Sequence, residues 1–326
     1  MPHYDLSLVE LEAHRCQVEE PAGLDDYWSR ALSAARIAAA DPVFDPYEQG
    51  TYGDLAVDDV TFTGGDGHPI KAWFLRPRDP GARSLACRVV FIGYGGGRSL
   101  PVTHALYAAA GHATLVMDTR AQGGEWQVGH TPDPALGSTG PEHPGVMTRG
   151  ILDPETYYYR RLYCDAVRAV ETAAAHPLVD PSRIAVAGFS QGGGLALAAA
   201  ALAPDLVALC HAGMPFLCDI ERAITVASEP PYTELVRYLA LHVELEPTVR
   251  RTLRHIDVAL LASRIRCRTL VSVGLMDPIC PPSTVFAAYN AITAEKEIAV
   301  YSFMGHEVPV QQEERELAEF ARMARA

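Results

Sequence analysis

Basic residues are scarce in this chain. Its 326 residues include 27 lysines and arginines against 40 acidic residues, a formal net charge of −13 at pH 7. Binding through the phosphates of a nucleic acid requires a basic surface, so this balance argues against nucleic acid as a partner. Long apolar runs are also lacking. The longest, around residues 192–218, is interrupted by Pro204 and Asp205, so we expect no membrane-spanning helix.

Patterns typical of disulfides, metal sites and export are missing as well. The seven cysteines show no paired metal-ligand spacing, and an odd number makes a poor disulfide framework. The first residues carry Asp5, Glu10 and Glu12 but neither a basic nor an apolar stretch, so we expect no signal peptide. Together these features predict a cytoplasmic protein with reduced thiols.

What the chain does have is a regular alternation of apolar strands and helices after about residue 87. Before it, two alternating stretches around a "GGDG" turn, 55–64 and 68–77, predict a β-hairpin. Strands that alternate with helices imply a mostly parallel sheet flanked by helices on both faces. We therefore predict one α/β domain over residues 1–326, with a helical N-terminal extension (1–50) and a helical insertion at about 219–265.

One serine stands at the corner between two of these elements. In "GFSQG" (residues 188–192) the pattern G-x-S-x-G falls between a predicted strand and a predicted helix, which is the context of a nucleophile elbow. The strained turn lifts Ser190 above the sheet, and Gly188 and Gly192 remove side chains that would collide there. The backbone N–H of Gln191 can then donate to an oxyanion. An ordinary tight turn is the alternative.

A serine nucleophile needs a base that an acid orients, and in the α/β-hydrolase fold the chain order is Ser, acid, His. Asp277 follows the apolar strand "LVSVGLM", and His306 follows the strand "IAVYSF". Both come just after the carboxyl ends of strands, at the edge where open α/β sheets build their sites. Alternatively, Asp277 caps the next helix and His306 is a plain loop histidine. Their order and common edge favour a triad of Ser190, Asp277 and His306.

The stretch "IGYGGGRS" (residues 92–99) is rich in glycine, which raises the question of a phosphate-binding loop. It lacks the Lys-Ser/Thr pair of a P-loop and does not match G-x-G-x-x-G. A flexible turn is one interpretation. We favour the second half of an oxyanion hole, with the Tyr94 N–H as donor.

Other polar residues are weaker candidates. His242 and His255 lie in the insertion, Asp219 and Asp257 precede the strand that should supply the acid, and no cysteine occupies an elbow, including Cys164, Cys218 and Cys280. A metal could be held by His130, Asp133, Glu142 and His143. Their segment is rich in proline and glycine, which favours a plain loop, and we expect no metal or organic cofactor.

The motifs of this chain resemble those of a known family. They include "DVTFTGGDGHPIKAWFLRP", "GILDPETYYYRRLYCDAVRAV", "GFSQGGG", "MPFLCD", "GLMDPICPPST" and "GHE". Over nearly its whole length the chain resembles the acetyl xylan esterases and cephalosporin-C deacetylases, the seventh carbohydrate esterase family of α/β-hydrolases. The resemblance implies Ser190, Asp277 and His306 as the triad and the backbones of Tyr94 and Gln191 as oxyanion donors. It also implies a hexamer assembled from trimers.

Two segments depart from the family's pattern. Where the family usually shows H-G-Y the chain has Ile92-Gly93-Tyr94, and where it shows R-G-Q-G the chain has Arg120-Ala121-Gln122-Gly123. The expected activity is a serine esterase that removes acetyl groups from acetylated xylo-oligosaccharides and cephalosporin-C-like esters. The alternatives are a peptidase of the prolyl-oligopeptidase type, another small-ester hydrolase, or a hydrolase-fold binding module without activity.

Overall fold

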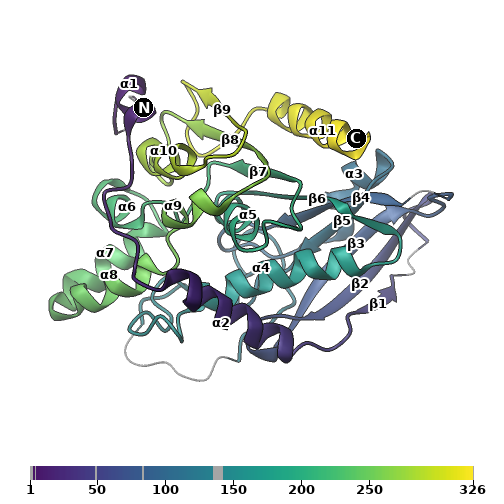
Figure 1. Cartoon of the computed structure of the whole chain (residues 1–326), viewed down its shortest axis with the longest axis horizontal. Helices are drawn as coiled ribbons and strands as arrows, with labels where there is room; N and C mark the ends of the chain where they lie inside the picture. The colour runs from purple at the N-terminus through teal and green to yellow at the C-terminus, as the bar shows by residue number, and fades with distance from the viewer. Residues whose placement is uncertain (1–2, 4, 48–49, 83, 135–141, 326) are drawn as a thin grey trace.

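The structure, a computed structural model, describes residues 3, 5–47, 50–82, 84–134 and 142–325. In this part of the chain the strands form one mixed sheet in the order β1-β2-β3-β5-β4-β6-β7-β8-β9 (Figure 1). The strands are β1 (Val43–Pro46), β2 (Leu55–Thr63), β3 (Pro69–Pro77), β4 (Leu85–Phe91), β5 (Ala113–Met117), β6 (Val179–Phe189), β7 (Leu209–Gly213), β8 (Arg268–Gly274) and β9 (Lys296–Tyr301).

The sheet is parallel from β5 through β4 to β9 and antiparallel at its other edge. Strands β2 and β3 pair antiparallel from Leu55 opposite Pro77 to Thr63 opposite Pro69, which confirms the predicted hairpin. Strand β3 also pairs antiparallel with β5, whereas the pairs from β5–β4 to β8–β9 are parallel. All carboxyl ends of the parallel strands therefore meet at one edge, where the candidate residues lie.

The expectation that residues 1–50 are helical is wrong for their last part. Strand β1 extends the sheet beyond β2, with Val43 opposite Thr61. Its Phe44 ring packs edge-on against Phe74, with the ring centroids 5.6 Å apart. Prolines at 42 and 46 disfavour a helix here because proline restricts the residue before it to extended conformations. An apolar contact with the sheet then makes the strand the stable alternative.

Helices cover both faces of the sheet (Figure 1). One face packs against α4 (Tyr158–Ala175), α5 (Gln191–Leu202) and α10 (Pro282–Ala291), and α2 (Leu24–Ile37) packs against α4. The other packs against α3 (Ala105–Ala109) and α11 (Val310–Arg325), where Tyr107 and Phe320 meet edge to face. No helix among the described residues combines the length and apolar character needed to cross a bilayer. None of the seven cysteines forms a disulfide.

The remaining helices belong to the N-terminal segment and to the region between β7 and β8. They are α1 (Leu8–Ala13), α6 (Ile220–Val226), α7 (Tyr232–Leu241), α8 (Glu246–Arg254) and α9 (Val258–Leu261), with the short 3₁₀ turns η3 (Val243–Leu245) and η4 (Ala262–Arg264) in the second region. Two further 3₁₀ turns lie elsewhere: η1 (Gly65–Gly67) between β2 and β3, and η2 (Pro101–His104) before α3. Residues 219–265 are thus largely helical, as the sequence indicates.

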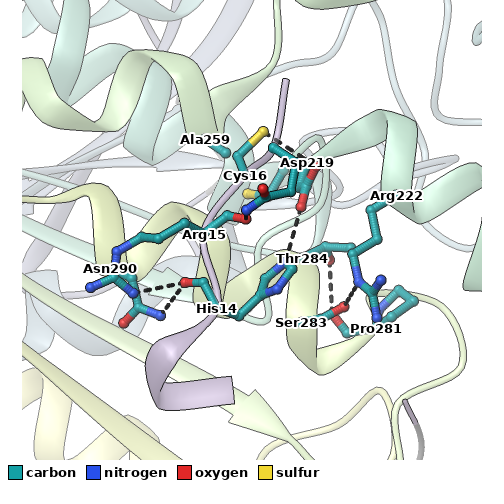
Figure 2. Close-up of polar contacts among 12 residues, drawn as sticks. His14, Arg15, Cys16, Asp219, Arg222, Ala259, Pro281, Ser283, Thr284 and Asn290 are labelled. Carbon is teal, nitrogen blue, oxygen red and sulfur yellow. Dashed lines mark hydrogen bonds and ion pairs between the residues drawn. The ribbon is translucent and has the colours of Figure 1, made fainter. Parts of the chain in front are cut away.

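Polar contacts tie the N-terminal segment to this helical region. Figure 2 shows His14 and Cys16 facing Asp219, with His14 Nε2 and Cys16 Sγ each 3.3 Å from a carboxylate oxygen. On the other side, the Asn290 amide donates to the His14 carbonyl at 2.8 Å. Asp257 in turn accepts the backbone N–H groups of Asp219 and Ile220. These aspartates fix chain turns and lie apart from the edge that carries Ser190.

Helix α5 lies unusually close to the strands that it covers, because its first turns lack side chains. A Cβ at Gly192 would lie 2.2 Å from the Phe91 carbonyl oxygen, and one at Gly194 would lie 2.2 Å from the Phe216 carbonyl oxygen. Neither backbone oxygen can move without disturbing a strand or the chain that follows it. The glycines after the serine are therefore a packing requirement.

We predict that Gly194→Ala lowers the free energy of unfolding by about 1–3 kcal/mol, the usual cost of overpacking a core. Gly124→Ala is the matched control, since a Cβ at Gly124 meets nothing within 4 Å, and it should change stability by less than about 0.5 kcal/mol. Denaturant unfolding of both variants measures the difference. Equal effects of the two substitutions would contradict the close approach of α5.

Candidate active site

Ser190 occupies the strained corner predicted for it. Its backbone has φ 58° and ψ −120°, outside the regions favoured for a non-glycine residue. Strand β7 and the segment after it hold it there: its N–H donates to the Gly213 carbonyl at 2.8 Å, and its carbonyl accepts from Phe216 N–H at 2.9 Å. A Cβ at Gly188 would lie 2.3 Å from the Gly192 carbonyl, so the turn tolerates no side chain on either side.

Asp277 and His306 come together at the same edge of the sheet. His306 Nδ1 lies 2.7 Å from Asp277 Oδ2. The other carboxylate oxygen accepts backbone N–H groups from Ile279 at 2.8 Å and Cys280 at 2.9 Å. Asp277 is fully buried, and both of its carboxylate oxygens are hydrogen-bonded. Such an arrangement fixes the imidazole ring and leaves Nε2 for proton transfer.

The buried Cys280 thiol lies beside the Ser190 side chain. Burial raises the pKa of this thiol well above its usual value, and the neighbouring Asp277 carboxylate adds to the effect. A thiol nucleophile acts as the thiolate, so a neutral thiol is a poor one. Of the two side chains, the chemistry of the site favours the serine.

Two backbone N–H groups at this edge lack an acceptor in the described part of the protein. Within the described residues, neither the Tyr94 N–H nor the Gln191 N–H donates a hydrogen bond to the protein. Tyr94 follows β4 after Ile92 and Gly93, and Gln191 opens α5. The Gly93 backbone passes close to the elbow, where a Cβ would lie 3.9 Å from the Ser190 Cβ. Two free donors beside a serine suit the charge of a tetrahedral intermediate.

The Gln122 side chain joins the two segments that carry these donors. Its Oε1 accepts from Gly95 N–H at 2.8 Å, and its Nε2 donates to Gln191 Oε1 and Tyr158 OH, each at 2.9 Å. Gln191 also accepts from the Tyr159 hydroxyl at 3.0 Å. The consecutive tyrosines of α4 therefore support the oxyanion donors from behind.

A buried ion pair anchors this support. The Arg120 guanidinium binds both oxygens of Asp165 at 2.6 Å, and the Tyr158 hydroxyl donates to the Arg120 carbonyl at 2.6 Å. Both charged side chains are at most 1% exposed. Bidentate pairs of this kind fix orientation as well as charge. They set the position of the chain that continues into Gln122.

A cavity of about 880 Å³ contains Ser190 and His306 on its wall. Tyr94, Trp126 and Ile279 also line it. Pro230, Pro231 and Glu234 also line the cavity, so the helical insertion covers part of the site. The volume suits a small molecule rather than a polymer segment buried on all sides.

The weaker candidates from the sequence lie elsewhere. Asp133 is the counter-ion of arginines, with its oxygens 2.5 Å from Arg161 and 3.3 Å from Arg149. His255 Nδ1 lies 2.8 Å from the Arg251 carbonyl, and the His242 ring packs on Tyr238. Groups that bring three possible metal ligands together, among the described residues, are Asp277–Cys280–His306 and Cys16–Asp219–Asp257; neither includes His130, Asp133, Glu142 or His143.

Sequence reasoning missed the supporting residues Gln122 and Glu234. Gln122 stands in the "RAQG" segment and Glu234 in the insertion, more than 100 residues from Tyr94, whose hydroxyl it accepts at 2.7 Å. The "YYYR" and "RAQG" motifs are visible in the sequence, but their contacts with the elbow are not. The sequence therefore shows that these motifs exist, but only the fold shows which residues they contact.

The two departures from the family pattern have different structural settings. Ile92 is buried among Trp73, Val116 and Ala108, and its carbonyl accepts from Gln191 Nε2 at 3.2 Å. Where the family pattern has a histidine, this chain thus has an apolar side chain that packs in the core. Ala121 has φ 60°, a left-handed conformation that favours glycine. The alanine is therefore strained where the family pattern has glycine.

We predict that Ala121→Gly raises the free energy of unfolding by about 1 kcal/mol, because it relieves a left-handed alanine. The same substitution at Ala34, in the exposed face of α2, should lower it by about 0.5–1 kcal/mol, since glycine weakens a helix. Chemical denaturation would measure both. A loss of stability at both positions would show that Ala121 is not strained.

Comparison with known proteins places the chain in a family. A model of the acetyl xylan esterase family (AXE1) matches residues 1–323. The acetyl xylan esterase from Paenibacillus sp. R4 is 35% identical and superposes over 97% of this chain and 99% of that chain, with a TM-score of 0.91. Acetyl xylan esterase 1 from Thermoanaerobacterium sp. JW/SL YS485 is 33% identical over 98% and 99% of the two chains, with a TM-score of 0.90.

A further relative, the acetyl esterase Axe7A of Xylanibacter ruminicola, is 32% identical over 164 residues. That match covers 50% of this chain and only 36% of the relative's length. The α/β-hydrolase fold and the family resemblance inferred from the sequence are both confirmed. Because the family match spans residues 1–323, the chain belongs to the acetyl xylan esterase family.

Proposed function

We propose that the protein is a serine esterase that removes acetyl groups from acetylated xylo-oligosaccharides, and from small acetyl esters such as cephalosporin C. One observation carries the proposal: His306, whose Nδ1 lies 2.7 Å from the buried Asp277 carboxylate, lines the same cavity as the strained Ser190 of the elbow. The relatives named as acetyl xylan esterases support the acetyl group and the sugar alcohol as the two halves of the substrate.

In the first half of the reaction, Ser190 Oγ attacks the acetyl carbonyl carbon while His306 Nε2 takes its proton. The buried Asp277 carboxylate stabilises the imidazolium that forms. The carbonyl oxygen becomes an oxyanion, which the Tyr94 and Gln191 N–H groups stabilise because they carry no competing hydrogen bond within the described protein. The imidazolium then protonates the leaving alcohol, and an acetyl group stays on Ser190.

In the second half, His306 takes a proton from water, and the resulting hydroxide equivalent attacks the acetyl carbonyl. The same two N–H groups bind the second oxyanion. Its collapse breaks the bond to Ser190 Oγ, which recovers its proton from His306 and releases acetate. Every step uses side chains and backbone groups of this chain.

We predict that Ser190→Ala lowers turnover of p-nitrophenyl acetate by about 10³-fold or more, as is usual for a member of a triad. His306→Ala should fail similarly, because among the described residues His306 is the base hydrogen-bonded to the Asp277 carboxylate. His255→Ala is the matched control and should retain normal turnover, since its ring packs on Tyr27, away from the cavity. Turnover close to that of the unchanged protein in purified, folded Ser190→Ala would refute the assignment.

We predict that activity falls steeply with the length of the acyl chain. Rigid Pro230 and Pro231 line the cavity together with Ile279, and a longer chain must displace packed groups at about 1–3 kcal/mol. Each step of about 1.4 kcal/mol costs tenfold in rate. Initial rates on p-nitrophenyl acetate, butyrate and octanoate measure the trend. A preference for butyrate or octanoate would overturn the deacetylase proposal and leave the serine mechanism standing.

A further inference from the structure

Glu234 is a buried carboxylate on the wall of the catalytic cavity. It belongs to α7 of the insertion, is 7% exposed, and lines the cavity together with Ser190. Glu234 takes no direct part in the proposed reaction. A buried charge is costly to maintain unless it is well hydrogen-bonded, so its presence beside the reacting centre needs a reason.

The carboxylate holds two segments of chain at once. Glu234 Oε1 accepts the Tyr94 hydroxyl at 2.7 Å, and Oε2 lies 3.3 Å from the Met147 N–H. The packing is close, because a Cβ at Gly145 would lie 2.2 Å from Oε2. The Tyr94 hydroxyl accepts in turn from Val146 N–H at 2.8 Å. Burial raises the pKa of Glu234, and its hydrogen bonds to Tyr94 and Met147 oppose that shift.

Tyr94 is therefore restrained at both ends. Its carbonyl accepts from Trp126 Nε1 at 2.7 Å, and its hydroxyl is bonded to Glu234. The next residue, Gly95, donates to Gln122. Of the polar groups of Tyr94, only the backbone N–H points to no acceptor among the described residues. Its direction follows from where the other groups are held.

We propose that Glu234 is a positioning residue for the oxyanion hole: through the Tyr94 hydroxyl it fixes the Tyr94 N–H toward the reacting carbonyl oxygen. The inference rests on the proposed esterase function and gives the helical insertion a part in transition-state stabilisation. A hydrogen bond between a hydroxyl and a carboxylate is stronger than one between neutral groups. Donors must be aimed before the charge develops, so a small loss of aim lowers kcat more than substrate binding.

A double-mutant cycle on p-nitrophenyl acetate tests the proposal, with rates expressed per active site counted by fluorophosphonate titration. Tyr94→Phe should lower kcat about tenfold and change KM by less than about twofold. This loss of kcat is smaller than the loss expected when an oxyanion donor is removed outright. Glu234→Gln should lower kcat several-fold, because the bond is no longer charge-assisted. The double variant should lose no more than Tyr94→Phe alone, since both changes act on one bond.

Glu244→Gln is the matched control, an exposed glutamate of the same insertion, and should leave kcat unchanged. Losses that multiply in the double variant, or a raised KM at unchanged kcat, would overturn the proposal, because Glu234 would then act on the substrate or on the fold. If Glu234→Gln does not fold, Tyr94→Phe decides alone, and normal kcat there overturns the proposal. Absence of turnover in the unchanged protein would instead refute the esterase function, and this inference with it.

Discussion

The close approach of helix α5 to the sheet is the constraint on which the site depends. Positions 188, 192 and 194 carry glycine, and a Cβ at any of them would lie 2.2–2.3 Å from a backbone atom. Because the helix lies so near, Ser190 must take a φ of 58° to pass from strand to helix. Two hydrogen bonds offset the strain: the Ser190 N–H donates to the Gly213 carbonyl, and the Ser190 carbonyl accepts from the Phe216 N–H. Tight packing thus holds Ser190 above the edge of the sheet and keeps the Gln191 N–H in a fixed position.

A buried network of polar side chains also restrains the elbow. Gln191, Gln122 and Tyr158 are hydrogen-bonded in series, and the series ends at the Arg120–Asp165 pair. Ion pairs of this depth contribute little net stability compared with apolar packing. Their benefit is a single arrangement of the chain, because each polar atom must keep its partner or be left unsatisfied. The network explains why buried polar side chains that do not reach the cavity are needed to position a site made largely of backbone donors.

Local signals in the sequence were enough for much of this architecture. The hairpin of β2 and β3 follows from alternation around a glycine turn, and the serine, aspartate and histidine follow from their places after strands. The contacts that organise the site were not predictable, because they join distant segments: Tyr94 and Glu234 are separated by 140 residues. Strand β1 was missed because its four residues, which follow Pro42 and end in Pro46, are too few to show a periodicity of their own. The hexamer and the cytoplasmic location, which no contact within one chain tests, stay predictions.

Asp277 shows why the structural and the catalytic interpretations of a residue need not compete. Asp277 does not cap α10, whose N-cap residue is Pro281. One of its oxygens instead accepts the N–H groups of Ile279 and Cys280 in the turn before that helix, and the other binds His306. With Oδ1 held by two donors, the carboxylate cannot rotate, so Oδ2 presents a fixed acceptor to Nδ1 of the imidazole. An aspartate in a flexible loop would have to be ordered in every catalytic cycle. The turn that leads into α10 has done that ordering during folding, and its two backbone hydrogen bonds to Asp277 are therefore part of the catalytic device.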